Sequence, residues 1–564
     1  MEHDYVIVGA GSAGCVLANR LSEDPAIRVL LVEAGPSDRR PAIHVPGTSS
    51  RLIGSAVDWA YITEPQRQLN GRTVPVPRGR TLGGSSSINA LAYLRGDRAD
   101  YDEWAALGNA GWSYDELLPY FVAAECNERG ASAVHGDDGP LHVSDVRDPH
   151  PLTHAFVQAG REAGLPRTDD FNGPHIEGAG YLQLTHHRGR RSSTAVGYLK
   201  PVSDRPNLTV VTRAHATRAR FDGLRAVGID YMRDGAAHHA AATREVILCG
   251  GVINSPQLLL LSGVGPAEHL RSKGIAVVCD VPGVGRNLQD HVSVGVGFRS
   301  TRRGPPALES FANLLRYLAT RRGRLASGPV EAAAFLRTSP SLPAPDVELL
   351  VVPPRLHPVV PTPKWAAARA RDIVIGLARP AARRSPGPPV FAMLVVAVKP
   401  RSRGFLELRS SDPLDAPVIH PNYLSDPGGE DLAVLVAGVK LARRVAAAPA
   451  LSSRLSAELQ PGPDVRSDEE IMAFVRSTAT SLQHPAGTCK MGVDALAVVD
   501  PELRVRGVKN LRVVDASVVP MIPRGHLNSP TITIAEKAAA LIAGRARSAA
   551  SARAGAETRG VSAP

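Results

Sequence analysis

The first residues follow the pattern of a buried strand, a glycine turn and a helix. Tyr5 to Val8 is an apolar, β-branched run that predicts a strand, and apolar positions at helical spacing follow to about Ser22. A second apolar run from Arg28 to Glu33 predicts another strand. Together these segments predict a βαβ unit that opens a parallel sheet.

Later apolar runs predict that the chain returns to the parallel sheet that the βαβ unit opens. Polar breaks separate short β-like runs in the middle of the chain, and a helix pattern follows Gly250-Gly251. Near the end, Ser529-Pro530 opens a helix that Gly544 stops, as capping rules expect. The first domain is therefore expected to be discontinuous. We expect strands at 208–212, 226–232, 245–248 and 511–514.

The segment between about Thr301 and Ser477 has a different texture, with Pro-rich connections, Arg-rich helices and β-like pieces. It predicts a substrate domain. After Arg545 the chain is Ala, Arg, Ser and Gly, which cannot offset the entropy of ordering, so a disordered tail is expected. The predicted division is a nucleotide-binding domain at 1–300 with substrate-domain insertions, a substrate-binding domain at 301–477, a return to the first domain at 478–544, and a tail at 545–564.

Composition narrows the class of protein. A chain of 564 residues with 43% hydrophobic content is long enough for two domains. The net charge of +11 is spread over the chain without stacking aromatic residues, which argues against nucleic-acid binding. No stretch is apolar enough to span a membrane. Five isolated cysteines have the spacing of neither a disulfide framework nor a metal knuckle, so no metal is expected. The cysteine pattern fits a reducing compartment, and the N-terminus leaves no room for a signal peptide, so a cytoplasmic location is expected.

The first glycine turn is a dinucleotide-binding motif in its proper context. Gly9, Gly11 and Gly14 lie between the first strand and helix, and Glu33 ends the next strand, where a carboxylate can bind a ribose hydroxyl. The glycines allow a tight turn, a close approach to the pyrophosphate and close packing of the helix, whose N-terminus favours negative charge. The motif alone does not separate FAD from NAD, because both carry adenosine diphosphate.

Several longer segments occur in a characteristic order along nearly the whole chain, from Asp4 to about Ala543. The set resembles the glucose-methanol-choline (GMC) oxidoreductases. The segments are Gly79-Arg-Thr-Leu-Gly-Gly-Ser-Ser-Ser-Ile-Asn89, Asn254-Ser-Pro-Gln-Leu-Leu-Leu-Leu-Ser-Gly-Val-Gly265, Gly283-Val-Gly-Arg-Asn-Leu-Gln-Asp-His291, His484-Pro-Ala-Gly-Thr488 and Val514-Asp-Ala-Ser517.

This resemblance implies an α/β fold, with a Rossmann-like FAD-binding domain and a second α+β substrate-binding domain built from an antiparallel sheet and helices. It also implies FAD rather than NAD. Some relatives attach FAD covalently through a His in the glycine-serine loop, but Ile88 occupies that position here, so noncovalent FAD is expected. The cofactor-binding residues carried over are Gly9, Gly11, Ser12, Ala13, Gly14, Glu33, Arg80, Gly83, Gly84, Ser85, Asn89, Ala92, Ala216, Asp515, Ala516, Asn528 and Thr531.

The resemblance also places two histidines beside the flavin, His484 and His526. Removing a hydride from a carbinol carbon requires removal of the hydroxyl proton, and a neutral imidazole suits that task near neutral pH. We assign one of them, His484 by preference, as the base, and the other as the group that holds the oxygen. Hydride is expected to go to flavin N5. The helix that begins after His526 should direct its positive end at the flavin pyrimidine, with Asn528 on the same edge.

Two further residues are pocket candidates. Tyr93 follows the flavin loop and could line the pocket or fill the core. Glu331 lies in a stretch that resembles a substrate-domain segment of the family, although a surface or structural role competes. The His186-His187 and His238-His239 doublets are interpreted as polar loops, and Cys489 as a packing residue.

The expected activity is oxidation of a primary or secondary alcohol, with oxygen, or a quinone or redox carrier, as acceptor. The alternative is a hydroxynitrile-lyase-type enzyme, in which the same His moves a proton while the flavin stays redox-silent. A serine hydrolase is excluded because no GxSxG elbow is present. Sequence leaves the alcohol, the acceptor, the identity of the base and the oligomeric state open.

Overall fold

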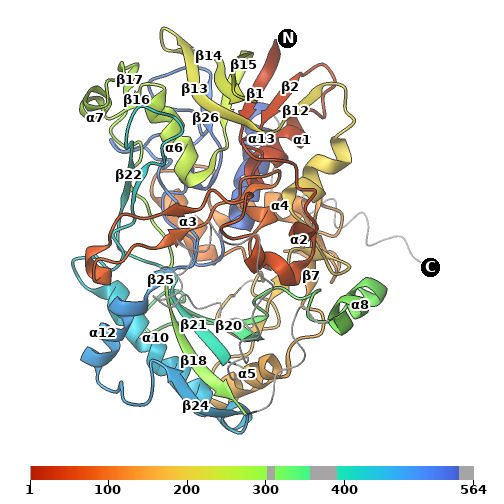
Figure 1. Cartoon of the computed structure of the whole chain (residues 1–564), viewed down its shortest axis with the longest axis vertical. Coiled ribbons are helices and arrows are strands. Elements are labelled where there is room, and N and C mark those ends of the chain that lie inside the picture. Colours follow the sequence, from red (N-terminus) through yellow and green to blue (C-terminus); the bar gives the residue numbers. More distant parts are fainter. Residues whose placement is uncertain (1, 174, 302–310, 356–389, 545–564) are drawn as a thin grey trace.

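A computed structural model describes residues 2–173, 175–301, 311–355 and 390–544. Its two large sheets lie in different halves of the molecule, and the chain passes between them more than once (Figure 1). The predicted α/β fold with a second, antiparallel α+β part is confirmed. The predicted tail, 545–564, lies outside the described residues.

The first sheet is built on the predicted βαβ unit. Strand β1 (His3–Val8), helix α1 (Ser12–Leu21) and strand β2 (Val29–Val32) follow the apolar runs within one or two residues. Strand β12 (Leu208–Val211) pairs in parallel with β2, and β15 (Ala236–Leu248) pairs in parallel with β1. The strand β26 (Leu511–Val513) joins β15 in parallel, so the end of the chain returns to the first layer as predicted.

Strand β15 forms both parallel and antiparallel pairs in this sheet. Its first half forms antiparallel pairs with β14 (Arg225–Arg233), which pairs in turn with β13 (Ala214–Asp222), and its second half joins the parallel layer. His238 and His239 therefore lie in a strand, and His186-His187 forms strand β10, of which His186 is fully buried. The interpretation of both doublets as polar loops was wrong, because cross-strand pairing orders them.

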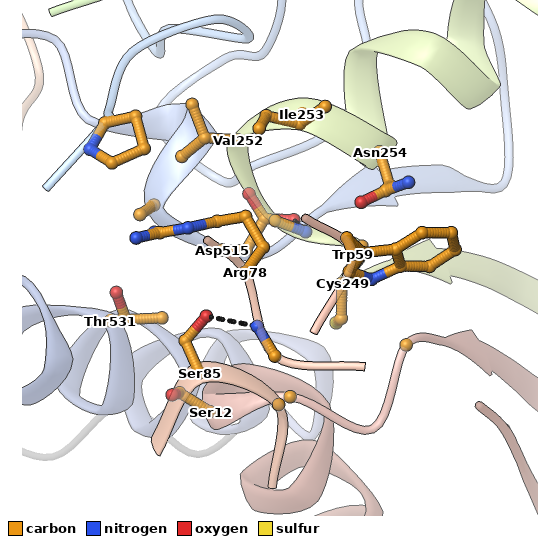
Figure 2. A pocket seen from close by; sticks show the side chains of 18 of the residues that line it. Ser12, Trp59, Arg78, Ser85, Cys249, Val252, Ile253, Asn254, Asp515 and Thr531 are labelled. Carbon is orange, nitrogen blue, oxygen red and sulfur yellow. Dashed lines mark hydrogen bonds between the residues drawn. The ribbon is translucent and has the colours of Figure 1, made fainter. Parts of the chain in front are cut away.

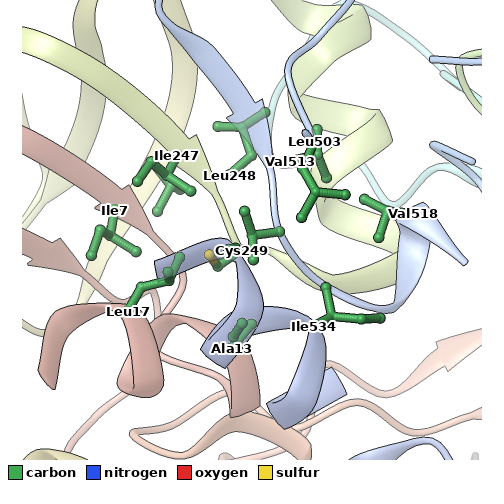
Figure 3. Packing of buried hydrophobic residues seen from close by; sticks show 14 of the residues in the cluster. Ile7, Ala13, Leu17, Ile247, Leu248, Cys249, Leu503, Val513, Val518 and Ile534 are labelled. Carbon is green, nitrogen blue, oxygen red and sulfur yellow. The ribbon is translucent and has the colours of Figure 1, made fainter. Parts of the chain in front are cut away.

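The carboxyl ends of the parallel strands meet at one edge. Helices α1, α6 (Gly251–Leu261) and α13 (Asn528–Ile542) begin next to that edge. Their apolar faces close the core around the strands (Figure 3). Ile7, Leu17, Ile247, Val513 and Ile534 are buried together in this core. Because the helices pack here, their N-termini are held around the same space.

The second sheet is antiparallel, in the order β24-β18-β21-β20-β19-β8. Residues before 300 supply β8 (Gly178–Tyr181) and β18 (Val292–Ser300), and later residues supply β19 (Ala332–Leu336), β20 (Val347–Arg355), β21 (Val390–Ala397) and β24 (Leu455–Gln460). The segment 1–300 thus contributes strands to both sheets. The proposed domain boundaries remain a prediction.

The two faces of the antiparallel sheet have different partners. Along β20, Val347, Leu349 and Val351 pack with helices α5 (Pro151–Glu162) and α10 (Glu430–Ala447), whereas Leu350 and Val352 belong to a separate cluster on the other face. Alternation along a strand sends successive side chains to opposite faces. Leu350 also lines the large cavity between the sheets. One face of this sheet is therefore a wall of that cavity.

Close packing of α10 on this sheet depends on one glycine, Gly438. A Cβ at this position would lie 2.2 Å from Val395 Cγ1 and 2.9 Å from Val347 Cγ2. We predict that Gly438→Ala lowers the free energy of unfolding by about 1 to 2 kcal/mol, because overpacking outweighs the better helix propensity of Ala. Thermal and urea unfolding would measure the change.

The matched control for this prediction is Gly297→Ala in β18 of the same sheet. The nearest atoms to a Cβ there are 3.6 and 3.7 Å away, which is ordinary contact distance. We expect its unfolding temperature to be unchanged or slightly higher. Equal unfolding temperatures for Gly438→Ala and the parent protein would contradict the packing argument.

Candidate active site

A large cavity lies at the carboxyl edge of the parallel strands, against the antiparallel sheet. Its walls come from segments far apart in the sequence, including Ser12, Trp59, Arg78, Asn254 and Thr531 (Figure 2). In open α/β sheets, ligands bind at this edge. Most of the predicted cofactor-binding residues line the cavity: Gly9, Gly11, Ser12, Ala13, Glu33, Gly84, Ser85, Asn89, Ala92, Ala216, Asp515, Ala516, Asn528 and Thr531.

The glycine turn is shaped by backbone contacts. Gly9 has φ +100°, and a Cβ there would lie 2.5 Å from Cys249 O. A Cβ on Gly14 would lie 1.9 Å from Gly9 O, so only glycine lets the helix pack on the turn. Gly11 differs, because its nearest neighbours would be 4.0 Å away and it faces the cavity. Backbone packing therefore requires glycine at positions 9 and 14, whereas Gly11 leaves open space on the cavity side.

Three of the predicted cofactor-binding residues, Gly14, Arg80 and Gly83, do not line the cavity. Gly14 is the packing residue described above, and Gly83 donates its N–H to Ala10 O at 2.7 Å, which ties the glycine-serine loop to the turn. Arg80 places its guanidinium 4.8 Å from the centre of the Trp59 ring. Trp59 itself lines the cavity. These residues therefore support the site without lining it.

Two buried carboxylates fix the backbone around the cavity. Glu33 accepts hydrogen bonds from Ala10 N at 2.9 Å and Gly35 N at 2.7 Å, and burial raises its pKa to about 7. Asp515 accepts from Gly251 N, Ser255 Oγ and Ser517 N at 2.6 to 2.8 Å, so it joins the start of α6 to the last strand. Burial also raises the pKa of Asp515.

Three helices start at the cavity and direct the positive ends of their dipoles toward it. Ser12 at the start of α1, Gly251 at the start of α6 and Asn528 at the start of α13 all line it. Free N–H groups and the helix dipole favour negative charge at such ends. Ser12 Oγ donates to Asn528 Oδ1 at 2.9 Å, which holds two of these ends together. The residues present suit a dinucleotide with a pyrophosphate and an electron-accepting ring.

Both predicted catalytic histidines line the same cavity, and their ring centres are 4.6 Å apart. A third histidine, His291, was not given a role from sequence, although it ends one of the segments that carry the family resemblance. Its Nδ1 is 3.0 Å from His484 Nδ1, and its Nε2 is 3.1 Å from Val398 O. The signal for His291 was in the sequence, but its contact with His484 was not.

Hydrogen bonding fixes the tautomer of His484. A carbonyl oxygen only accepts, so His291 donates to Val398 O through Nε2 and its Nδ1 is an acceptor. His484 therefore donates through Nδ1, which leaves Nε2 as the lone-pair nitrogen toward the cavity. Burial lowers the pKa of His291 to about 3 and, with the charge of His526, lowers the pKa of His484 well below its ordinary value. Both imidazoles are neutral at neutral pH.

The loop before His484 is held in an unusual backbone conformation. Gln483 has φ +69°, and Arg78 Nη2 donates to its carbonyl at 2.5 Å. Asp290 accepts from His484 N at 2.8 Å, and also from Ser481 Oγ and Tyr423 Oη. Such strain persists only where the surroundings hold it. These contacts set the position of the His484 ring, and sequence gave no reason to assign them.

The two pocket candidates do not line the cavity. Tyr93 is 2% exposed and its Oη accepts from Arg95 Nε at 3.2 Å. Glu331 is buried and accepts from His150 N and Thr153 Oγ1 at 2.8 and 2.6 Å. Among the described residues, no cluster could hold a metal ion, and no helix is long and apolar enough to cross a membrane. All five cysteines are unpaired, and Cys489 is buried in the core.

Comparisons with known proteins point to one family. The GMC oxidoreductase family models match residues 3–293 and 400–535. An alcohol dehydrogenase [acceptor] from Pseudomonas putida is 44% identical over 550 residues, covering 96% of this chain and 95% of the relative. A mitochondrial choline dehydrogenase from Mus musculus is 46% identical, covering 96% and 90%.

Solved structures agree with these relatives. Pyridoxine 4-oxidase from Mesorbium loti superposes with a TM-score of 0.85 at 32% identity, covering 97% of this chain and all of that one. A formate oxidase variant from Aspergillus oryzae, studied for FAD modification, gives a TM-score of 0.85 at 28% identity, covering 96% and 98%.

The contrast between Gly11 and Gly14 gives a test of the cofactor site. We predict that Gly11→Ala leaves the unfolding temperature of the apoprotein unchanged but weakens FAD binding roughly tenfold or more, since the methyl group enters the cavity. Gly14→Ala should lower the unfolding temperature even without FAD. Flavin fluorescence titration and thermal unfolding of both apoproteins would measure this, and equal stability of the two variants would contradict it.

Because His291 is buried and neutral, we predict that the folded protein loses stability in acid. The pKa of His291 is lowered to about 3 in the folded protein. Between pH 3 and about 6.5 the unfolded chain therefore binds a proton that the folded chain does not. The free energy of unfolding consequently falls as the pH falls through this range. His291→Gln should reduce the slope of stability against pH in this range by about 1.4 kcal/mol per pH unit. Urea unfolding between pH 4 and 7 measures the slope. The exposed His238→Gln is the control, and an unchanged slope in His291→Gln would contradict the assignment.

Proposed function

The chain belongs to the GMC oxidoreductase family, and from that premise we propose that it oxidises an alcohol to a carbonyl compound with His484 as base and His526 as the group that holds the oxygen. The enzyme uses FAD and acts on CH–OH groups. The observation that carries the proposal is the cavity that brings both histidines to the predicted FAD residues.

His484 is suited to take the hydroxyl proton. Its ring is neutral, and the hydrogen bond to His291 leaves Nε2 free to accept. His526 lies beside it and can donate to the oxygen as negative charge develops there. FAD, which the cavity-lining residues of the glycine turn and of the starts of α6 and α13 would hold, would supply the acceptor for the hydride of the carbinol carbon. The protein orients the alcohol and moves its proton.

The cavity wall nearest the antiparallel sheet suggests the type of alcohol. Val330, Leu350 and Leu482 line the cavity and pack in one apolar cluster with Leu91. Apolar walls with a few polar groups are typical of sites that orient a small apolar ligand. We propose that the substrate is an alcohol with an aliphatic chain or an aromatic ring, and we expect the enzyme to prefer it to choline or a sugar alcohol.

Anaerobic titration tests the activity and the histidines together. We predict that His484→Ala and His526→Ala retain yellow flavin, but that the rate at which 1-octanol or benzyl alcohol bleaches it falls by about 100-fold or more. His238→Ala is the exposed-histidine control and should behave as the parent protein. Normal bleaching in both active-site variants would refute the assignment.

The same titration separates the remaining alternatives. A flavin that no alcohol bleaches, in a protein that cleaves a cyanohydrin, would support the hydroxynitrile-lyase alternative. Rapid reoxidation of the reduced enzyme in air with release of peroxide would identify oxygen as the acceptor, and slow reoxidation would favour a quinone or redox carrier. We also propose that FAD is bound noncovalently, because Ile88 cannot attach it, and that the protein is cytoplasmic.

A further inference from the structure

A buried carboxylate beside the histidine pair makes no hydrogen bond. Glu348 on β20 is completely buried, and neither carboxylate oxygen makes a hydrogen bond. Leu350, two residues along the strand, lines the cavity, so Glu348 projects from the same face of the sheet. Burying a carboxylate without compensation is costly, and such a group needs an explanation.

Glu348 forms an ion-pair contact with His526. Oε1 lies 3.4 Å from His526 Nε2, and this nitrogen is also buried without a hydrogen bond. The separation exceeds a charge-assisted hydrogen bond but is within the range of a strong electrostatic interaction. Because Nε2 is turned to Glu348 and the ring lines the cavity, Nδ1 is the nitrogen of His526 left for a ligand.

The basic side chains of neighbouring segments have partners of their own. Arg78, whose charge contributes to the lowered pKa of His484, donates to the Gln483 carbonyl. Arg524 Nη1 pairs with Asp100 Oδ1 at 2.5 Å, and Lys399 Nζ pairs with the same oxygen at 3.2 Å and with Glu103 at 2.6 Å. His484 and His291 are neutral, since burial lowers the pKa of both. Within the described part of the chain, Glu348 is the one carboxylate that pairs with His526.

Glu348 and His291 thus give the two active-site histidines opposite surroundings. His484 is backed by a neutral imidazole that only accepts its proton, and His526 is backed by a carboxylate. A nearby negative charge favours the protonated imidazole, whereas burial against neutral groups favours the free base. Environments that separate two titratable groups in this way indicate which is the acid and which is the base.

We propose that Glu348 is a positioning residue that keeps the proton on Nε2 of His526 and favours its imidazolium form. His526 then donates through Nδ1 to the substrate oxygen while His484 remains the base. This assignment rests on the proposed function for its chemical meaning, but the electrostatic coupling of Glu348 to His526 exists in the enzyme without substrate.

Nuclear magnetic resonance of ¹⁵N-histidine in the FAD-loaded enzyme tests that coupling without turnover. His526→Gln identifies the His526 signals. We predict that, at a fixed pH, Glu348→Gln lowers the ratio of doubly protonated to neutral His526 rings by about 10-fold or more, because the opposite charge is lost. Glu348→Leu should lower this ratio equally, whereas Glu458→Gln, which removes a carboxylate paired with Arg443 elsewhere in the same sheet, should not change it.

A pH profile connects the coupling to chemistry. The rate of flavin reduction is measured against pH with 1-octanol or benzyl alcohol, whichever bleaches the flavin faster. In Glu348→Gln we expect this rate to begin its fall at a lower pH than in the parent enzyme, since His526 must be protonated to donate. An unchanged protonation ratio of His526 in both Glu348 variants overturns the inference, as does a change in only one of them, which would indicate packing. If instead His526→Gln reduces flavin normally while the Glu348 variants change the ratio, the proposed function fails and the coupling stands.

Discussion

Close approach of backbones at the carboxyl edge of the parallel sheet is the constraint on which the site depends. Gly9, Gly14 and the Cys249 carbonyl pack so tightly that a single added methyl group would overlap main-chain atoms. This contact determines the direction in which α1 follows β1 and how close the start of α6 lies to the glycine turn. With these backbones in place, α1 and α6 both start at the cavity, and the hydrogen bond from Ser12 to Asn528 holds the start of α13 beside them. The positive ends of the helix dipoles favour negative charge there.

The antiparallel sheet completes the site from the other side. Its two faces are unlike, because one packs on α5 and α10 while the other faces the cavity. The face toward the cavity carries apolar residues such as Leu350, but also the buried Glu348. A sheet to which both parts of the chain contribute strands therefore gives the cavity an apolar wall and places a carboxylate beside His526.

The asymmetry of His484 and His526 follows from these surroundings rather than from the residues themselves. Both are imidazoles beside the same cavity, with ring centres 4.6 Å apart. His291 and the Val398 carbonyl fix the tautomer of the first, and Glu348 provides the charge beside the second. Asp290 and the strained Gln483 hold the first ring in place. In this way a pair of identical side chains can divide acid and base roles.

Sequence alone determined the βαβ opening, the glycine turn with Glu33, the return of the final strand and helix, and the histidines at 484 and 526. These features depend on local periodicity, on turns that require glycine, or on motifs that stay together along the chain. Tertiary structure decided the rest: the strand conformation of the His186-His187 and His238-His239 doublets, the structural places of Tyr93 and Glu331, and the contacts of His291 with His484 and of Glu348 with His526. Each of these contacts joins residues whose proximity depends on strand pairing and helix packing, which act across sequence distances that no local pattern records.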